Sequence, residues 1–147
     1  MAQKYLKRIV ASYVRDKEVP YSKSLTTPEE VARSFAYLAT RDREEFVALH
    51  LDKGNRPLCW DRVSMGSLSE TIVHPREVFK VALISSASAV IFIHNHPSGR
   101  GEPSPEDRCL TQKLQEAAKL LEIKVLDHLI IYGDEGQVFS FQEHGLL

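Results

Sequence analysis

The sequence predicts a single α/β domain in which helices flank a central mixed β-sheet. Three observations support this fold class. The chain of 147 residues is long enough for one domain with a substantial core. Apolar runs typical of strands alternate along the chain with segments of helical periodicity. The resulting order of elements, βαββαβαββ, is typical of a sheet with helices packed on it.

The first two elements are expected to be a strand and a helix. Residues 5–16 (YLKRIVASYVRD) are rich in β-branched and aromatic side chains, so we expect a strand that joins the core, although the periodicity also allows a helix. Residues 24–42 predict a helix because Thr27 is suited to cap it and Pro28 to occupy its first position. Apolar side chains in this segment also recur on one helical face.

A β-hairpin and a second helix are expected next. The runs EFVALHLD (residues 45–52) and PLCWDRVSMG (residues 57–66) have strand composition and are joined by the turn sequence KGNR. Residues 73–87 again carry a proline near the start, Pro75, and predict a helix.

The last four elements complete the α/β pattern. Residues 88–94 form a short, continuously apolar run, which is typical of a strand buried on both faces. The Ser-Pro sequence at Ser104 opens a helix that is expected to end near Ile123. Residues 125–145 predict a final pair of strands around the turn sequence GDEG.

Composition limits the classes of function. A formal net charge of −1 gives no general reason to expect binding to nucleic acid or to an anionic membrane. No apolar run is long enough to cross a membrane, and the N-terminus lacks the apolar core of a signal peptide. The two cysteines, Cys59 and Cys109, lack metal-site spacing and suit a reducing compartment, so a cytoplasmic protein is expected. We expect Cys109 to be a buried thiol without a catalytic role.

The sequence His-Asn-His at the end of the third predicted strand is the strongest chemical signal. Because side chains of a strand repeat every two residues, His94 and His96 point the same way. Two imidazoles directed at one point suit a divalent metal, and zinc accepts nitrogen ligands readily. Asp107, in the first turn of the next helix, offers a carboxylate as third ligand. Three protein ligands with one position open for water is the pattern of a catalytic zinc site.

A purely structural interpretation is also available. Ser104 and Asp107 have the spacing of a capping box, in which both residues only satisfy the helix N-terminus. The two interpretations are compatible, since the cap can hold the backbone of Asp107 while its carboxylate faces the metal. His128, flanked by apolar residues, is expected to bond internally, with support of a metal ligand as the alternative.

The segment HNHPSGRGEPSPED, residues 94–107, resembles the JAMM motif of the JAB/MPN metalloproteins, and its details are similar to the RadC-like branch. The segments EEFVALHLDKGNR, VHPREVFKVAL, LEIKVLDHLIIY and FSFQEHGLL resemble that branch in the same order. The resemblance covers residues 24–147, which we take as the RadC-like domain, with residues 1–23 as an N-terminal segment. It implies the JAB/MPN fold, with a cytidine-deaminase-like arrangement, in a short form without the helix-hairpin-helix region of longer members.

The resemblance also implies roles for single residues. His94, His96 and Asp107 match the zinc ligands of the family. Ser104 matches a serine that, in active JAMM peptidases, helps to hold the developing oxyanion, and simple N-capping is its alternative role.

An upstream glutamate that moves the proton of the attacking water is expected as well, by the same resemblance. Glu44 and Glu45 precede the apolar run FVALHLD, and strand alternation places only one of them on the side of the site. The likeness of this run to the corresponding strand of the branch favours Glu44, with Glu45 in reserve. The alternative is that both are solvated acids.

Three functions from different classes remain. The first is a zinc-dependent metallopeptidase or isopeptidase that hydrolyses amide bonds of a peptide or protein through a metal-activated water. The second is a metal-dependent protein acting on nucleic acid. The resemblance links it to DNA repair through the family name and to mobile elements through neighbouring genes, but the charge does not support it. The third is a non-catalytic partner-binding module. A homodimer paired through the N-terminal strand is a further conjecture.

Overall fold

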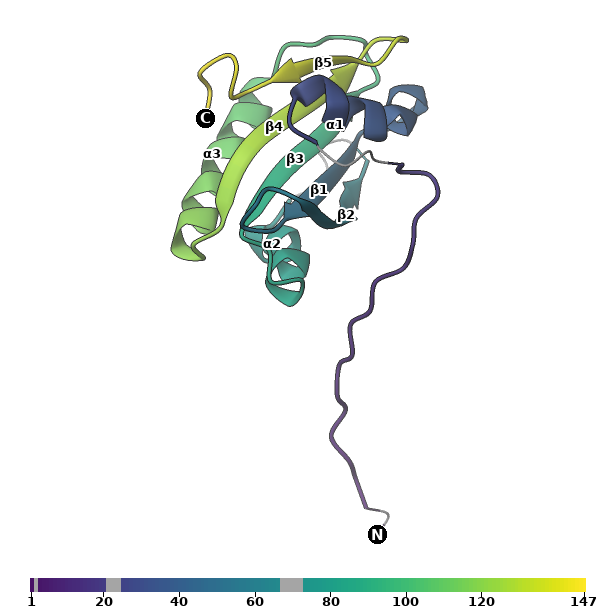
Figure 1. The fold of residues 1–147 in the computed structure, drawn as a ribbon, viewed down its shortest axis with the longest axis vertical. Coiled ribbons are helices and arrows are strands. Elements are labelled where there is room, and N and C mark those ends of the chain that lie inside the picture. The colour runs from purple at the N-terminus through teal and green to yellow at the C-terminus, as the bar shows by residue number, and fades with distance from the viewer. Residues whose placement is uncertain (2, 21–24, 67–72) are drawn as a thin grey trace.

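The computed structural model describes residues 1, 3–20, 25–66 and 73–147. Helices lie on both faces of a twisted five-stranded sheet, as the sequence predicts (Figure 1). Among the described residues, no helix combines the length and the apolar character that spanning a bilayer requires.

The sheet has the strand order β2-β1-β3-β4-β5. Its strands are β1 (Glu45–Leu51), β2 (Pro57–Met65), β3 (Ala89–His96), β4 (Lys124–Tyr132) and β5 (Gln137–Ser140). Strands β3 and β4 are parallel, because α3 carries the chain back between them, and the other neighbouring pairs are antiparallel. The sheet is therefore mixed, with β3 at its centre.

The helices are α1 (Pro28–Ser34), the 3₁₀ helix η1 (Ala36–Thr40), α2 (Pro75–Ile84) and α3 (Pro105–Leu120). Capping boxes mark the starts of α1 and α3, whereas α2 and η1 begin without a side-chain cap. Each α-helix has proline in its first turn, and α1 starts with a complete capping box between Thr27 and Glu30.

The single first helix expected over residues 24–42 is instead α1 followed by η1. The side chains of Phe35 and Leu38 are both fully buried. Phe35 lies between α1 and η1, and Leu38 lies within η1, where three residues per turn bring its side chain into the same core as Phe35. The third helix ends at Leu120, slightly before the expected position.

Alternating side chains of the strands build two cores. On one face, Val47, Leu49 and Ile93 pack with residues of α1 and η1. On the other face, Phe46 and Phe92 pack with residues of α2 and α3. The central strand β3 is buried on both faces, as its continuous apolar run predicts.

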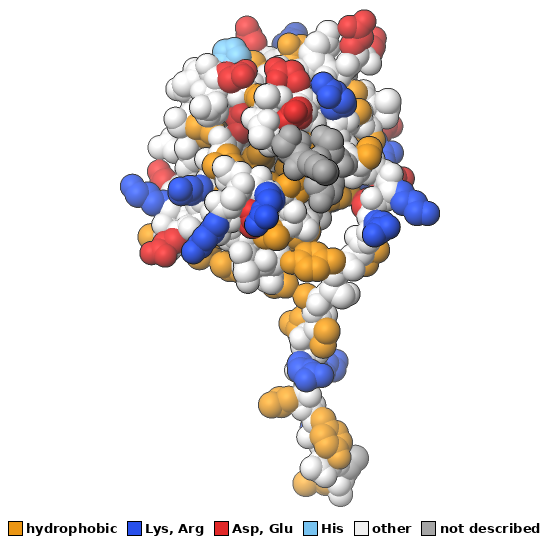
Figure 2. Space-filling view, viewed as in Figure 1, with side chains coloured by type: hydrophobic (Ala, Val, Ile, Leu, Met, Phe, Trp, Pro, Cys, Tyr) orange, Lys and Arg blue, Asp and Glu red, His pale blue; other side chains and the backbone are white. Residues whose placement is uncertain are grey.

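The strand expected over residues 5–16 is not present: residues 3–20 contain neither strand nor helix, and the segment extends away from the domain (Figure 1). The large apolar side chains of residues 5–14 are exposed, alongside basic ones (Figure 2), whereas Val19 is half-buried against the core. They occur in pairs at residues 5–6, 9–10 and 13–14, with charged or small residues between. In an extended chain this spacing makes neither face of residues 5–14 continuously apolar, so this stretch has no apolar side with which to dock on the domain.

Candidate metal centre

The candidate site lies where the end of β3 meets the start of α3. The strand delivers His94 and His96 to the same side, and the loop of residues 97–104 returns the chain to the helix. Ser104 Oγ accepts the Asp107 amide N–H at 3.1 Å, and the Ser104 amide donates to Asp107 Oδ2 at 2.7 Å. The expected capping box is therefore formed, and it also fixes the carboxylate that faces the histidines.

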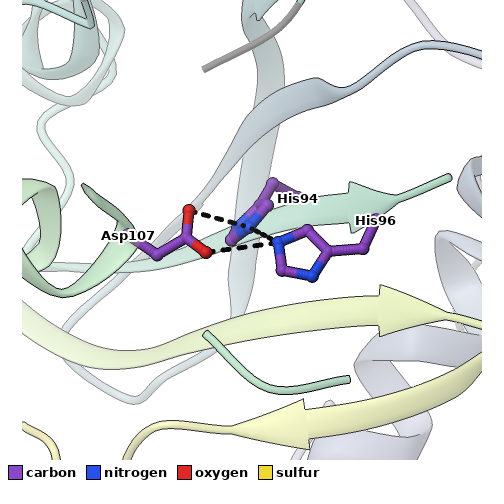
Figure 3. A group of neighbouring side chains, drawn as sticks. All are labelled: His94, His96 and Asp107. Carbon is purple, nitrogen blue, oxygen red and sulfur yellow. Dashed lines mark hydrogen bonds and ion pairs between the residues drawn. The ribbon is translucent and has the colours of Figure 1, made fainter. Parts of the chain in front are cut away.

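Three side chains converge at this point (Figure 3). His94 Nε2 lies 2.9 Å from His96 Nε2 and 3.4 Å from Asp107 Oδ1. His96 Nε2 lies 3.2 Å from Asp107 Oδ2. One ligand atom from each residue lies within 4.8 Å of the other two. His94, His96 and Asp107, which we call the ligand cluster, are therefore close enough to bind one ion.

The donor set fits a divalent metal. His96 Nδ1 lies 2.8 Å from the carbonyl oxygen of Arg100, which only accepts hydrogen bonds, so Nδ1 carries the proton. Neutral His96 consequently directs the lone pair of Nε2 towards His94 and Asp107. Two imidazole nitrogens and one carboxylate oxygen are ligands that zinc binds in proteins, and a fourth position remains for a non-protein ligand.

Electrostatics also favour a cation in the ligand cluster. Burial raises the pKa of the Asp107 carboxyl, but the adjacent rings of His94 and His96, which donate to the carboxylate when they are protonated at Nε2, outweigh burial and hold this pKa far below its ordinary value. For His96, burial lowers the pKa, whereas Asp107 and the Arg100 carbonyl accept from the ring when both of its nitrogens are protonated, and they give a net rise. The pKa of the nearby His128 lies well below its ordinary value, chiefly because burial disfavours the charged ring. An ionised carboxylate thus faces two imidazoles in a setting that favours positive charge between them.

The two candidate glutamates lie in different surroundings. Glu44 lines the cavity beside His96 and Asp107. The carboxylate of Glu45 is nearly buried and is bound by Arg62 Nε at 2.9 Å and Arg41 Nε at 3.3 Å. Glu44 therefore lies on the wall of the cavity that leads to the ligand cluster, whereas Glu45 forms ion pairs with Arg41 and Arg62.

Asn95, the middle residue of His-Asn-His, explains why Glu44 takes this side. Its side chain alternates away from both histidines. Asn95 Oδ1 accepts the amide N–H of Glu45 at 2.7 Å, and Asn95 Nδ2 donates to the Arg43 carbonyl at 2.9 Å. Both peptide groups that flank Glu44 are thereby held by one buried amide.

An open cavity of about 710 Å³ leads to the ligand cluster. Of the described residues that line it, four carry carboxylates and one is cationic. They are Glu44, Glu102, Glu106, Asp107 and Arg100. The cavity is therefore negatively charged before any metal binds.

Sequence reasoning missed the contacts that hold the cavity-lining residues Arg100 and Gly101. The backbone carbonyl of Arg100, which fixes His96, carries no sequence signal. Gly101 packs against the ring of Tyr132 so closely that a Cβ atom would lie 2.4 Å from Cζ.

The prediction that Cys109 is a buried thiol is wrong, because that residue is exposed. Its position two residues after the buried Asp107 turns it away from the core.

Comparison with known proteins points to one family. The RadC-like JAB domain family matches residues 25–146. The chain is similar to the UPF0758 protein YfjY of Escherichia coli (strain K12), with 43% identity over 148 residues that cover 99% of this chain and 90% of that protein. It is also similar to a UPF0758 protein of Trichlorobacter lovleyi, with 54% identity over 123 residues, 83% of this chain and 53% of that protein. The chain thus spans about half the length of some curated relatives and most of the length of others.

Proposed function

The chain belongs to the RadC-like JAB domain family, and from this premise we propose that it is a zinc-dependent hydrolase of amide bonds. The observation that carries the proposal is the convergence of two imidazole nitrogens and a carboxylate at the base of an open cavity. A structural metal site would be closed by a fourth protein ligand, whereas this set leaves room for water and substrate.

Bound zinc would polarise the scissile carbonyl and lower the pKa of a coordinated water towards about 7. His94, His96 and Asp107 would hold the ion. Glu44, on the cavity wall, would accept the proton of the attacking water and return it to the leaving amine. The clamp that Asn95 makes on both sides of Glu44 would keep this carboxylate in place between the two transfers.

Ser104 would stabilise the charge that develops on the carbonyl oxygen. Its Oγ accepts the Asp107 amide N–H, so its own proton is available to an acceptor in the cavity that Ser104 lines. A donor preorganised in this way is worth about 2.7–4 kcal/mol in known oxyanion holes. The capping box thus gives Ser104 both a structural and a catalytic role.

We propose a peptide or protein as the substrate. The carboxylates of Glu44, Glu102 and Glu106 in the cavity lining would repel a polyanionic backbone, which weakens the alternative of a nucleic-acid substrate. A non-catalytic binding module would have no use for an open ligand set beside a positioned glutamate, which weakens the third alternative.

The test is a comparison of zinc-loaded wild type with Glu44→Gln and Asp107→Ala variants. Fluorogenic peptides and isopeptide-linked peptides would be assayed beside single- and double-stranded DNA. The proposal predicts zinc-dependent cleavage of an amide substrate that is lost in both variants, with Glu44→Gln still binding zinc. Zinc-dependent cleavage of DNA that is lost in both variants would overturn the proposed substrate class.

A further inference from the structure

A chain of buried hydrogen bonds lies behind the ligand cluster. His94 Nδ1 lies 2.8 Å from His128 Nε2 on β4. His128 Nδ1 lies 2.6 Å from Thr111 Oγ1, and this hydroxyl donates to the carbonyl oxygen of Asp107 at 2.6 Å. The four residues are at most 2% exposed. The chain therefore joins one ligand on β3 to the backbone of another on α3, through Thr111 and His128.

The chemistry of the partners fixes the direction of every bond. A carbonyl oxygen only accepts, so the single hydroxyl proton of Thr111 is committed to Asp107. Thr111 Oγ1 must then accept from His128, whose Nδ1 therefore carries a proton.

His128 is fully buried, and its ring stacks on Phe141 with the centroids 4.6 Å apart. Its two nitrogens bond to a hydroxyl and to another imidazole, neither of which is a carboxylate. A buried imidazole in such surroundings is neutral. His128 Nε2 is consequently an acceptor, and His94 must donate from Nδ1, which leaves the lone pair of His94 Nε2 directed into the ligand cluster.

We propose that Thr111 and His128 are positioning residues that hold His94 in the Nδ1–H tautomer and so set the affinity of the ligand cluster for its metal. Without the Thr111 hydroxyl, His128 can place its proton on either nitrogen. In one of these arrangements His128 donates to His94, whose remaining proton then occupies Nε2 and blocks metal binding. The inference rests on the metal site of the proposed function and is independent of the reaction.

The experiment uses Thr111→Val, which keeps the shape of the side chain and removes the hydroxyl, and Thr111→Ser, which restores it. Thr40→Val is the matched control, because Thr40 also donates to a backbone carbonyl but lies in η1. Zinc dissociation constants would be measured by chelator competition. The tautomer of His94 would be read from long-range ¹H–¹⁵N correlation spectra of the metal-free protein, with circular dichroism to verify the fold.

We expect wild type, Thr111→Ser and Thr40→Val to show His94 protonated only at Nδ1. Thr111→Val should show mixed tautomers and a zinc dissociation constant raised about 10–100-fold. A folded Thr111→Val protein that binds zinc as tightly as wild type, or wild-type His94 protonated at Nε2, would overturn the inference. Failure of the proposed hydrolase activity would leave both readouts intact, so the two failures are distinguishable.

Discussion

Adjacent glutamates at the start of β1 should respond to the same substitution in opposite ways. Glu44→Gln and Glu45→Gln both remove one charge and keep the size of the side chain. Glu44 is partly exposed and lines the cavity, so its substitution should change the free energy of unfolding by about 0.5 kcal/mol or less. It should also abolish proton transfer and therefore hydrolysis.

Glu45→Gln should instead destabilise the fold. The Glu45 side chain is 4% exposed and is bound by Arg62 and Arg41, which are 37% and 41% exposed. Because solvent screens both guanidinium groups, the loss should stay well below that of a fully buried ion pair. Hydrogen bonds to charged groups contribute about 1.5–3 kcal/mol, so we expect a loss of about 1–3 kcal/mol.

Urea unfolding and hydrolysis assays on the zinc-loaded proteins separate the two effects. With an m-value of about 2 kcal/mol/M, a loss of 2 kcal/mol lowers the midpoint of the Glu45→Gln variant by about 1 M. Its activity should persist below that midpoint. If Glu45→Gln abolished hydrolysis in folded protein while Glu44→Gln retained it, the assignment of the two glutamates would be reversed.

Three further predictions concern Gly101 in the cavity lining, the metal and the first helix. Gly101→Ala should displace the loop from Tyr132 and loosen the bond between the Arg100 carbonyl and His96. Zinc binding, measured by chelator competition, should therefore weaken. Unchanged zinc affinity would show that the close packing of Gly101 on Tyr132 is not needed. Removing zinc should lower the free energy of unfolding. The loss should be about 2.7 kcal/mol relative to protein held at a free zinc concentration one hundred times the dissociation constant. In thermal melts, added zinc but not Mg²⁺ should restore the stability. Hydrogen bonds from Thr26 hold the pKa of Glu30 below its ordinary value. Ionised Glu30 therefore stabilises the fold at pH values above its unfolded pKa of about 4.3, and this stabilisation is lost as the pH falls through its folded pKa. The stability advantage of wild type over Glu30→Gln in urea should therefore shrink as the pH is lowered from 6, and an advantage that grew instead would contradict this sign.

Local signals predicted most of the fold. Proline and a capping residue mark the starts of α1 and α3, and the continuous apolar run of β3 identifies the central strand. The prediction of a strand over residues 5–16 was wrong, because β-branched composition alone does not provide a neighbouring strand to pair with. Only the paired spacing of its apolar residues indicates that an extended form lacks an apolar face.

The ligand cluster was predictable because its geometry follows from short-range rules. Strand alternation aligns His94 with His96, and the capping box fixes Asp107. Thr111 could not be identified in this way. Its contact with His128 joins α3 to β4 across the fold, and a threonine within a helix has no distinguishing pattern. The clamp of Asn95 on the peptides around Glu44 likewise depends on the pairing of β1 with β3.

Anomalous scattering at the zinc edge, on crystals of the protein purified without chelator, tests the metal site most directly. We expect one peak per chain, at about 2.0–2.2 Å from the Nε2 atoms of His94 and His96 and from a carboxylate oxygen of Asp107, with solvent at a fourth position. Absence of this peak in zinc-supplemented crystals, or an ion held by other residues, would contradict the account.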